Sequence, residues 1–258
     1  MIQEQLAHLP EFLPDYRPFP PVKEHTAWQG LPLRAKQRFC RRGKPRCKRH
    51  CAPAALALAG FHPHWAAHPM GDGLLFPPAR LCALVSAECV EHKGRFLDEI
   101  ADTVWAICEE SAWQLPAHNS YVRDTPQLPL PDTSQPIVEL FAAETGALLA
   151  LTRYLLHDEL DTTAPGIAAR MERELDARIL TPYFTGHFWW MGNGAEAMCN
   201  WTSWCSQNVL LTVFLLPTSQ EQRCAAVKQA AYSLDCFLKD YSADAAATRA
   251  HSIIATPG

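Results

Sequence analysis

No part of this 258-residue sequence is apolar for long enough to cross a lipid bilayer. The longest apolar run, VLLTVFLL at residues 209–216, is far shorter than the roughly 20 residues that a spanning helix needs. Residues 1–21 lack the basic and apolar segments of a secretory signal. The net charge of −4 gives no reason to expect a nucleic-acid partner. We therefore expect a cytoplasmic protein that binds neither membranes nor nucleic acid.

The cysteines also lack the context of a disulfide framework. Ten cysteines without a secretion signal are expected to be mostly free thiols in a reducing compartment. Cys199 and Cys205 are expected to be inert thiols rather than a disulfide or metal ligands. Five others at helical spacings are expected to be small core residues: Cys82, Cys89, Cys108, Cys224 and Cys236. Nothing in the sequence indicates a cofactor.

Strand patterns are missing as well, whereas the chain from residue 80 onward is regularly helical. Long connections at 113–135 and 184–199 alternate with short turns. In consecutive antiparallel helices, every second connection lies at the same end, so the two long loops are expected to share one end and to carry the function. The pattern predicts an all-α stack of helical hairpins, with helices at 1–9, 80–92, 96–112, 136–157, 165–183, 200–216 and 219–241.

Several helix ends have recognisable signals. Gly94 is expected to end the helix at 80–92, and Pro136 is expected to open the next long helix. Ser219 and Gln222 have the spacing of a capping box. The helix at 136–157 is expected to bury one stripe, which consists of Leu140, Phe141, Glu144, Leu148, Leu151 and Leu155. The proline-rich segment before residue 35 is expected to strap across the surface of the helices.

Residues 36–79 differ from the rest of the chain. Nine Lys and Arg residues lie between Arg34 and Arg49 without an acid, and cysteines and histidines follow without a sustained period. Cys and His are zinc ligands, but the Cys-x6-Cys-x3-Cys and His-x-His spacings match no ordinary zinc site. A zinc-binding protein built on this segment is the weakest of the functional alternatives.

The residues with the clearest chemistry lie in the two long loops. Four of the eight tryptophans fall in the second loop and the helix start that follows it, beside Asn200: Trp189, Trp190, Trp201 and Trp204. Flat rings beside amides suit a sugar, although buried tryptophans that only fill a core have the same composition. Glu109 and Glu110, at a helix end, are expected to be solvated. The first loop supplies Trp113, His118, Asn119, Tyr121 and Arg123, of which His118 and Tyr121 are candidate proton-transfer groups.

Three strings, in order, resemble the heparinase II/III family of polysaccharide lyases. They are WAICEESAWQLPAHN (105–119), LFAAETGALLALTRYLL (140–156) and FWWMGNGAEAMCNWTSWCSQNVLLTVFLL (188–216), followed by a helix that ends in LKDYSAD. The resemblance covers residues 80–244 and implies an incomplete (α/α) toroid that precedes a β-sandwich domain. It also implies β-elimination on uronic-acid glycans, and therefore an acidic oligosaccharide or polysaccharide as partner.

The resemblance assigns roles to a few residues. Asn200 matches the asparagine that faces the uronate carboxylate, but its neighbour here is Trp201, where some members have a histidine base. His118 and Asn119 match a substrate-lining Pro-Ala-His-Asn segment. Together with the loop residues singled out above, this predicts a catalytic set of Asn200 and His118 and a substrate-binding set of Trp113, Asn119, Tyr121, Trp189, Trp190, Trp201 and Trp204.

Other family features are missing from these 258 residues. The Gly-Cys-Asp-Glu-Gly-Pro-x-Tyr loop that carries the tyrosine acid is absent from the sequence, as is the β-domain. We therefore expect an inactive lyase fragment, with a non-catalytic glycan-binding module as the alternative. An open helical array that exposes an apolar face would favour aggregation or a homodimer.

The atypical composition of residues 36–79 and 245–258 leads to a testable hypothesis about the gene. We expect both segments to be out-of-frame translations, with domains at 1–35 (helix and strap) and 80–244 (toroid). Sequencing the coding DNA from codon 30 to several hundred bases past the stop should then show, in a shifted frame, the Gly-Cys-Asp-Glu-Gly-Pro loop and a β-rich region. A clean frame with nothing family-like beyond it contradicts the hypothesis.

Overall fold

Helix is the main secondary structure in the part of the chain that the structure describes. The computed structural model describes residues 1–6, 8, 10, 12–43, 68–115, 118–123 and 130–239, without the side chains of residues 68–77, and contains no strand within them. The all-α prediction is confirmed. The helices are α1 (Ile2–Gln5), α2 (His25–Gln29), α3 (Leu33–Gly43), α5 (His68–Glu91), α6 (Leu97–Glu109), α7 (Leu140–Thr163), α8 (Ile167–Leu175), α9 (Thr181–Thr185), α10 (Trp201–Leu215) and α11 (Gln220–Leu238).

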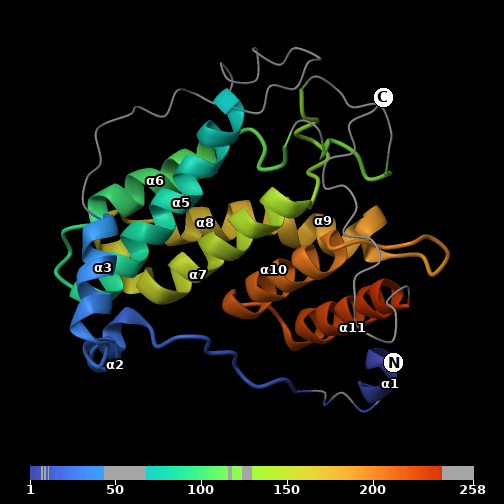
Figure 1. The fold of residues 1–258 in the computed structure, drawn as a ribbon, viewed down its shortest axis with the longest axis horizontal. Coiled ribbons are helices and arrows are strands. Elements are labelled where there is room, and N and C mark those ends of the chain that lie inside the picture. Colours follow the sequence, from blue (N-terminus) through green and yellow to red (C-terminus); the bar gives the residue numbers. More distant parts are fainter. Residues whose placement is uncertain are drawn as a thin grey trace.

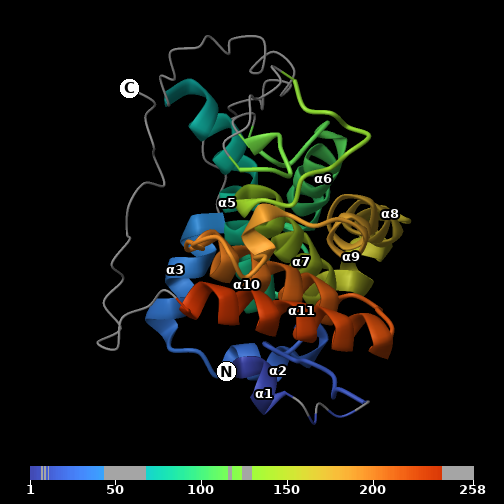
Figure 2. The ribbon, with the colours of Figure 1, turned by 90° about the vertical axis from the view of Figure 1, so that its right-hand side faces the viewer.

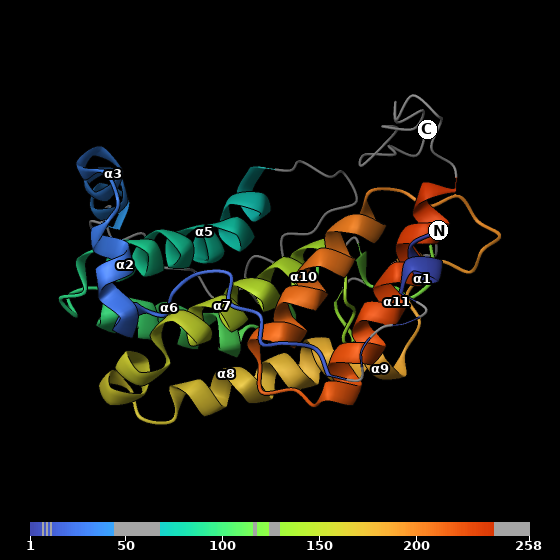
Figure 3. The same ribbon diagram turned by 90° about the horizontal axis from the view of Figure 1, so that it is seen from below.

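Helices that follow one another in the sequence pack as hairpins. The pairs are α5 with α6, α7 with α8, and α10 with α11, and α7 joins them because it also packs against α10, α5 and α6 (Figure 1). Seen from below, α8 and α9 run along one side of the molecule, behind α7 and α10 in Figure 1 (Figure 3). The predicted helical hairpins are thus present, whereas their closure into a toroid stays a prediction.

The central helix α7 is buried on more than one side, which differs from the expected single stripe. Its small residues Ala143, Gly146 and Ala150 are fully or almost fully buried, and Gly146 lies close to Ile179 and Thr212 of neighbouring segments. Glu144, expected on the buried stripe, is exposed. The stripe was wrong because a helix enclosed by several neighbours buries small residues all round rather than large residues on one face.

The start and end of α7 also differ from expectation. Pro136 does not open the helix, because the backbone carbonyls of Pro136 and Val138 accept hydrogen bonds from Tyr121 and Trp190. The helix begins at Leu140, where the Glu139 side chain caps it. Near the expected end, Leu156 has non-helical backbone angles, but the helix resumes and continues through the predicted turn to Thr163.

The segment predicted as one helix from 165 to 183 is three pieces. Between α8 and α9, residues Asp176–Leu180 form a π-helical segment. A π segment inserts an extra residue into the helical repeat and is frequent at functional sites. It carries Arg178 on one side and the fully buried Ile179 on the other.

The expected N-terminal strap is present at residues 13–21, whereas helical segments replace it from Val22 onward. Residues 13–21 have no helix, and they cross α11, α10 and α7 along the lower edge of Figure 1 (see also Figure 2). Gln220 exchanges two hydrogen bonds with the backbone of Leu13, and Tyr154 donates one to Phe19 O at 2.8 Å. Beyond the strap, the backbone N–H groups of Ile2 and Gln3 bind Asp235 in α11.

Two further expectations need correction. Residues 36–43, grouped with the aperiodic segment, belong to α3, which packs on α5 through hydrogen bonds from Arg80 to the carbonyls of Arg42 and Gly43. The periodicity of a highly charged helix lies in its basic residues, and a search for apolar periodicity does not detect it.

Cys82, expected in the core, is exposed, whereas Cys89 and Cys108 are buried as predicted. The capping box at Ser219 and Gln222 is also confirmed.

Packing at Gly146 leads to a prediction about stability. A Cβ atom there would lie 2.8 Å from Cγ1 of Ile179, a fully buried side chain with little room to move. Gly146→Ala should therefore lower the free energy of unfolding by about 1–3 kcal/mol, measured by urea denaturation. The matched control is Gly30→Ala, because Gly30 has ordinary helical backbone angles and its added Cβ would lie 3.4 Å from the nearest atom. Equal stability of the two variants would contradict the prediction.

Candidate functional site

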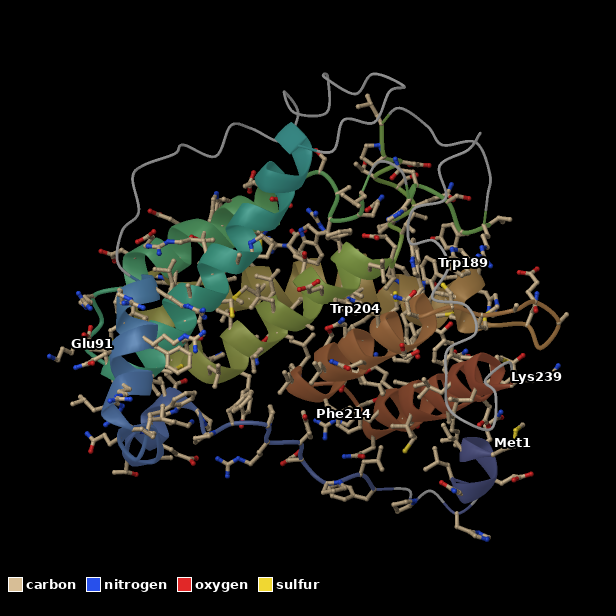
Figure 4. All side chains as sticks on the ribbon, in the orientation of Figure 1. Met1, Glu91, Trp189, Trp204, Phe214 and Lys239 are labelled. Carbon is tan, nitrogen blue, oxygen red and sulfur yellow. The ribbon has the colours of Figure 1, made fainter. Side chains whose placement is uncertain are left out.

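The two long loops meet, as the alternation of connection lengths predicted. The backbone N–H of Trp189 donates to Tyr121 O at 3.1 Å, and Arg123 donates to Ala197 O at 3.4 Å. The guanidinium of Arg123 lies 5.0 Å from the centroid of the Trp189 ring, at cation–π distance. Figure 4 labels Trp189 beside the start of α10 and the first long loop.

His118 completes this meeting point. Its ring lies edge-on to Trp201 with centroids 4.6 Å apart, and Trp201 in turn contacts Trp189 at 4.9 Å. We call His118, Arg123, Trp189 and Trp201 the loop cluster. All four side chains are partly or fully exposed, so a cation, an imidazole and two indole rings are presented together to solvent.

A residue that the sequence interpretation missed supports the cluster from below. Glu139 is 1% exposed, and its Oε2 lies 2.8 Å from Nδ1 of His118. Its other oxygen, Oε1, accepts hydrogen bonds from the backbone N–H groups of Phe141 and Ala142, at the start of α7. Burial raises the pKa of the nearby Cys205 thiol, and the Glu139 carboxylate adds to the shift. The only sequence signal for Glu139 was a single acid between two apolar runs.

Two of the predicted ligand-binding tryptophans are core residues. Trp190 is 1% exposed and donates its indole N–H to Val138 O at 2.7 Å. Trp113 is also buried, and its indole N–H donates to Ile107 O at 2.9 Å. Both indoles are almost completely buried, and their N–H groups join the loops to neighbouring backbone rather than to a ligand. Adjacent tryptophans point in different directions here, so composition could not distinguish Trp190 from Trp189.

Tyr121 is part of a stack of near-parallel rings that leads into the core. Its ring lies 4.7 Å from Phe188, which lies 5.9 Å from Trp190, which lies 6.4 Å from Tyr183. The Tyr121 hydroxyl donates to Pro136 O at 3.2 Å. Burial raises the pKa of this hydroxyl, and Asp132 adds to the shift. Tyr121 therefore braces the first loop, and its phenol is poorly disposed to act as a base.

The remaining candidates lie around the loop cluster. Asn119 accepts a hydrogen bond from Gln114 at 3.2 Å. Asn200 lies directly before α10 with an exposed side chain, and no hydrogen bond joins its amide to another described residue. Trp204, one turn further along α10, is 48% exposed and does not touch the ring of His118 or Trp189 among the ring contacts of the described residues (Figure 4).

A cavity of about 360 Å³ lies against both ends of the first loop. Its lining includes Trp113, Gln114, Asp132, Ser134 and Arg178. Arg178 is held by the carboxylate of Glu174 and by the carbonyls of Cys108 and Glu110, and its guanidinium lies 4.8 Å from the Trp113 ring. The arginine thus closes the end of α6, and the cavity has no concentration of unpaired charge.

No metal centre is found within the described ranges. Groups of three or more His, Cys, Asp or Glu side chains that could hold an ion are absent from them. Most of the residues on which the zinc alternative depends, among them Cys47, His50, Cys51, His62 and His64, lie outside the described residues. Likewise, none of the helices in the described part is long and apolar enough to cross a membrane.

Comparison of the chain with protein-family models, and with curated proteins, finds no match. The resemblance to the heparinase II/III family therefore stays an expectation, and the geometry of the loop cluster is the firmest basis for a function.

A partly buried carboxyl at the end of α6 gives a prediction about pH. Glu109 is exposed as expected, whereas Glu110 is only partly exposed, and burial raises its pKa from 4.5 to about 7 against the opposing effect of Arg178. The folded state then holds a proton that the unfolded chain has lost, and the free energy of unfolding falls as the pH rises from about 4.5 to about 7.

Glu110→Gln should abolish this fall. Thermal unfolding should show the variant close to wild type near pH 4 and more stable at pH 8 by about 1–3 kcal/mol, since one pKa unit corresponds to 1.36 kcal/mol. The control is Glu109→Gln, because Glu109 is exposed and pairs with Arg170 at the surface, where ion pairs contribute little. A Glu110→Gln variant that follows wild type across this pH range would contradict the prediction.

Proposed function

We propose that the loop cluster binds uronic-acid-containing oligosaccharides, and that residues 80–244 are the toroid portion of a heparinase II/III-like lyase. The observation that carries the proposal is the meeting of both long loops at partly exposed indole rings beside a cation and an imidazole. Indole faces stack on sugar rings, and Arg123 supplies positive charge for a carboxylate. Two of the three sequence strings that resemble the family contribute residues to the cluster, and the third begins directly after Glu139.

In β-elimination, a base removes the proton α to the uronate carboxylate, and the electron pair forms a C4=C5 double bond. The C4–O bond breaks, and the leaving oxygen takes a proton from an acid. His118 is the group in the cluster that suits the base, and Asn200 or Arg123 would face the carboxylate. The acid has no candidate among the described residues of the cluster, because the Tyr121 hydroxyl already donates to Pro136 O.

We therefore propose that these 258 residues on their own bind the glycan without cleaving it. A catalytic set that lacks one of its coupled members usually loses most of its rate. The two hypotheses, a non-catalytic binding module and a lyase fragment, therefore use the same site. They differ in whether the natural protein supplies the missing acid.

Binding can be tested by titrating intrinsic tryptophan fluorescence with uronic-acid oligosaccharides, with neutral glucose oligosaccharides as the ligand control. A saturable change is expected for the acidic ligands. Trp201→Ala and Arg123→Gln should each weaken binding at least tenfold, which corresponds to about 1.4 kcal/mol. Trp105→Ala is the matched control, since Trp105 is a 51% exposed tryptophan on α6 that also lies beside an arginine.

Two outcomes would contradict the proposal. No saturable change with any acidic oligosaccharide would remove the binding site. Accumulation of an ultraviolet-absorbing unsaturated uronide would show that the 258 residues cleave the glycan. In that second case, His118→Ala should abolish the product.

A further inference from the structure

The two oxygens of Glu139 have different partners. Oε1 accepts from the backbone N–H groups of Phe141 at 2.9 Å and Ala142 at 3.0 Å, whereas Oε2 faces Nδ1 of His118 at 2.8 Å. The carboxylate is almost completely buried. It therefore connects the first turn of α7 directly to the imidazole of the loop cluster.

We propose that Glu139 is a positioning residue that holds His118 in the tautomer protonated at Nδ1. An ionised carboxylate only accepts hydrogen bonds, so the imidazole nitrogen that faces it must carry a proton. In the neutral ring, the lone pair then belongs to Nε2. His118 thus offers Nε2 as the atom that accepts a proton or a hydrogen bond from a ligand.

The surroundings of Glu139 favour the charged carboxylate that this assignment needs. The start of an α-helix carries partial positive charge and unpaired N–H donors, and both act on Oε1. A buried charge without partners would be costly, and here the helix start and His118 compensate it together. Burial raises the pKa of the neighbouring Cys205 thiol, which therefore stays neutral and adds no negative charge beside the carboxylate.

The plane of the imidazole is fixed from a second direction. The Trp201 ring lies at 71° to it, with centroids 4.6 Å apart. The backbone of His118 is held by a hydrogen bond to Leu115 O at 2.8 Å. A hydrogen bond at Nδ1, an indole edge contact and a backbone bond together leave the ring little freedom to flip, so the assigned nitrogen stays the same.

Glu139→Gln tests the proposal because it replaces one acceptor oxygen of the carboxylate with an NH₂ group that donates, and leaves the other oxygen an acceptor. The two backbone N–H groups require an oxygen at the position of Oε1, so the amide NH₂ must occupy the position of Oε2. It would then donate to Nδ1 of His118, which must accept. Nitrogen-15 NMR of the neutral His118 ring should show the proton at Nδ1 in wild type and at Nε2 in the variant.

The control is Glu144→Gln, an exposed position on the same helix, which should keep the wild-type tautomer. A wild-type ring protonated at Nε2, or a Glu139→Gln ring that stays protonated at Nδ1, would overturn the proposal. If Glu139→Gln does not fold, wild type alone decides. The carboxyl carbon of Glu139 should then show a chemical-shift step at the same pH midpoint as the His118 nitrogens, and its absence would also overturn the proposal.

This inference deepens the proposed function and rests on it only for the nature of the ligand. The tautomer is measured in protein without oligosaccharide. Loss of glycan binding with an intact Nδ1–H tautomer would therefore reject the proposed function alone, and the reverse result would reject the positioning role alone.

Discussion

The indole N–H of Trp190 is the constraint on which the site depends. The ring is buried, so its donor must find an acceptor inside the protein, and it finds one in Val138 O. The backbone carbonyl of Trp190 in turn accepts a hydrogen bond from the hydroxyl of Thr202, in the first turn of α10. One residue therefore fixes the second loop to the residue before Glu139 and to the residue after Trp201. The loop cluster takes its shape from a tryptophan that does not belong to it.

Charged side chains hydrogen-bond the backbone at the two helix ends that flank the first long loop. At the end of α6, Arg170 and Arg178 donate to Cys108 O, and Arg178 also donates to Glu110 O. At the start of α7, Glu139 accepts from two backbone N–H groups. Cations at a C-terminus and an anion at an N-terminus oppose the helix dipole and satisfy groups that the helix leaves unpaired. The loop that carries His118 thus begins and ends at well-anchored points.

Periodicity and helix-end signals sufficed to predict the helical hairpins from α5 to α11, the Ser219 capping box and the common end of the long loops, but not α2, α3 or every helix end. These features depend on local patterns that the chain repeats over many residues. The composition of the site depends on the directions in which individual side chains point, and local sequence patterns do not determine these. Trp189 and Trp190 are neighbours with the same composition, yet one faces Arg123 and the other faces the core.

Glu139 could not be predicted for a related reason. Pro136 gave a stronger helix-start signal. The helix starts at Leu140 instead, because the carbonyls just before it accept hydrogen bonds from the side chains of Tyr121 and Trp190. Similarly, the sequence around Glu110 is that of an ordinary acid at a helix end and does not reveal that its side chain is partly buried.

The attachment of the chain's first residues to Asp235 has a consequence for how the molecule assembles. The hairpins join neighbours in sequence, so they can form early and locally. The bond from Ile2 N to Asp235 instead spans 233 positions, and the strap bonds at Leu13 span 207. Contacts of such separation form only after a very large loop has closed, so they are slow to form. The N-terminal segment is therefore a late clasp, which secures a helical array that has already folded.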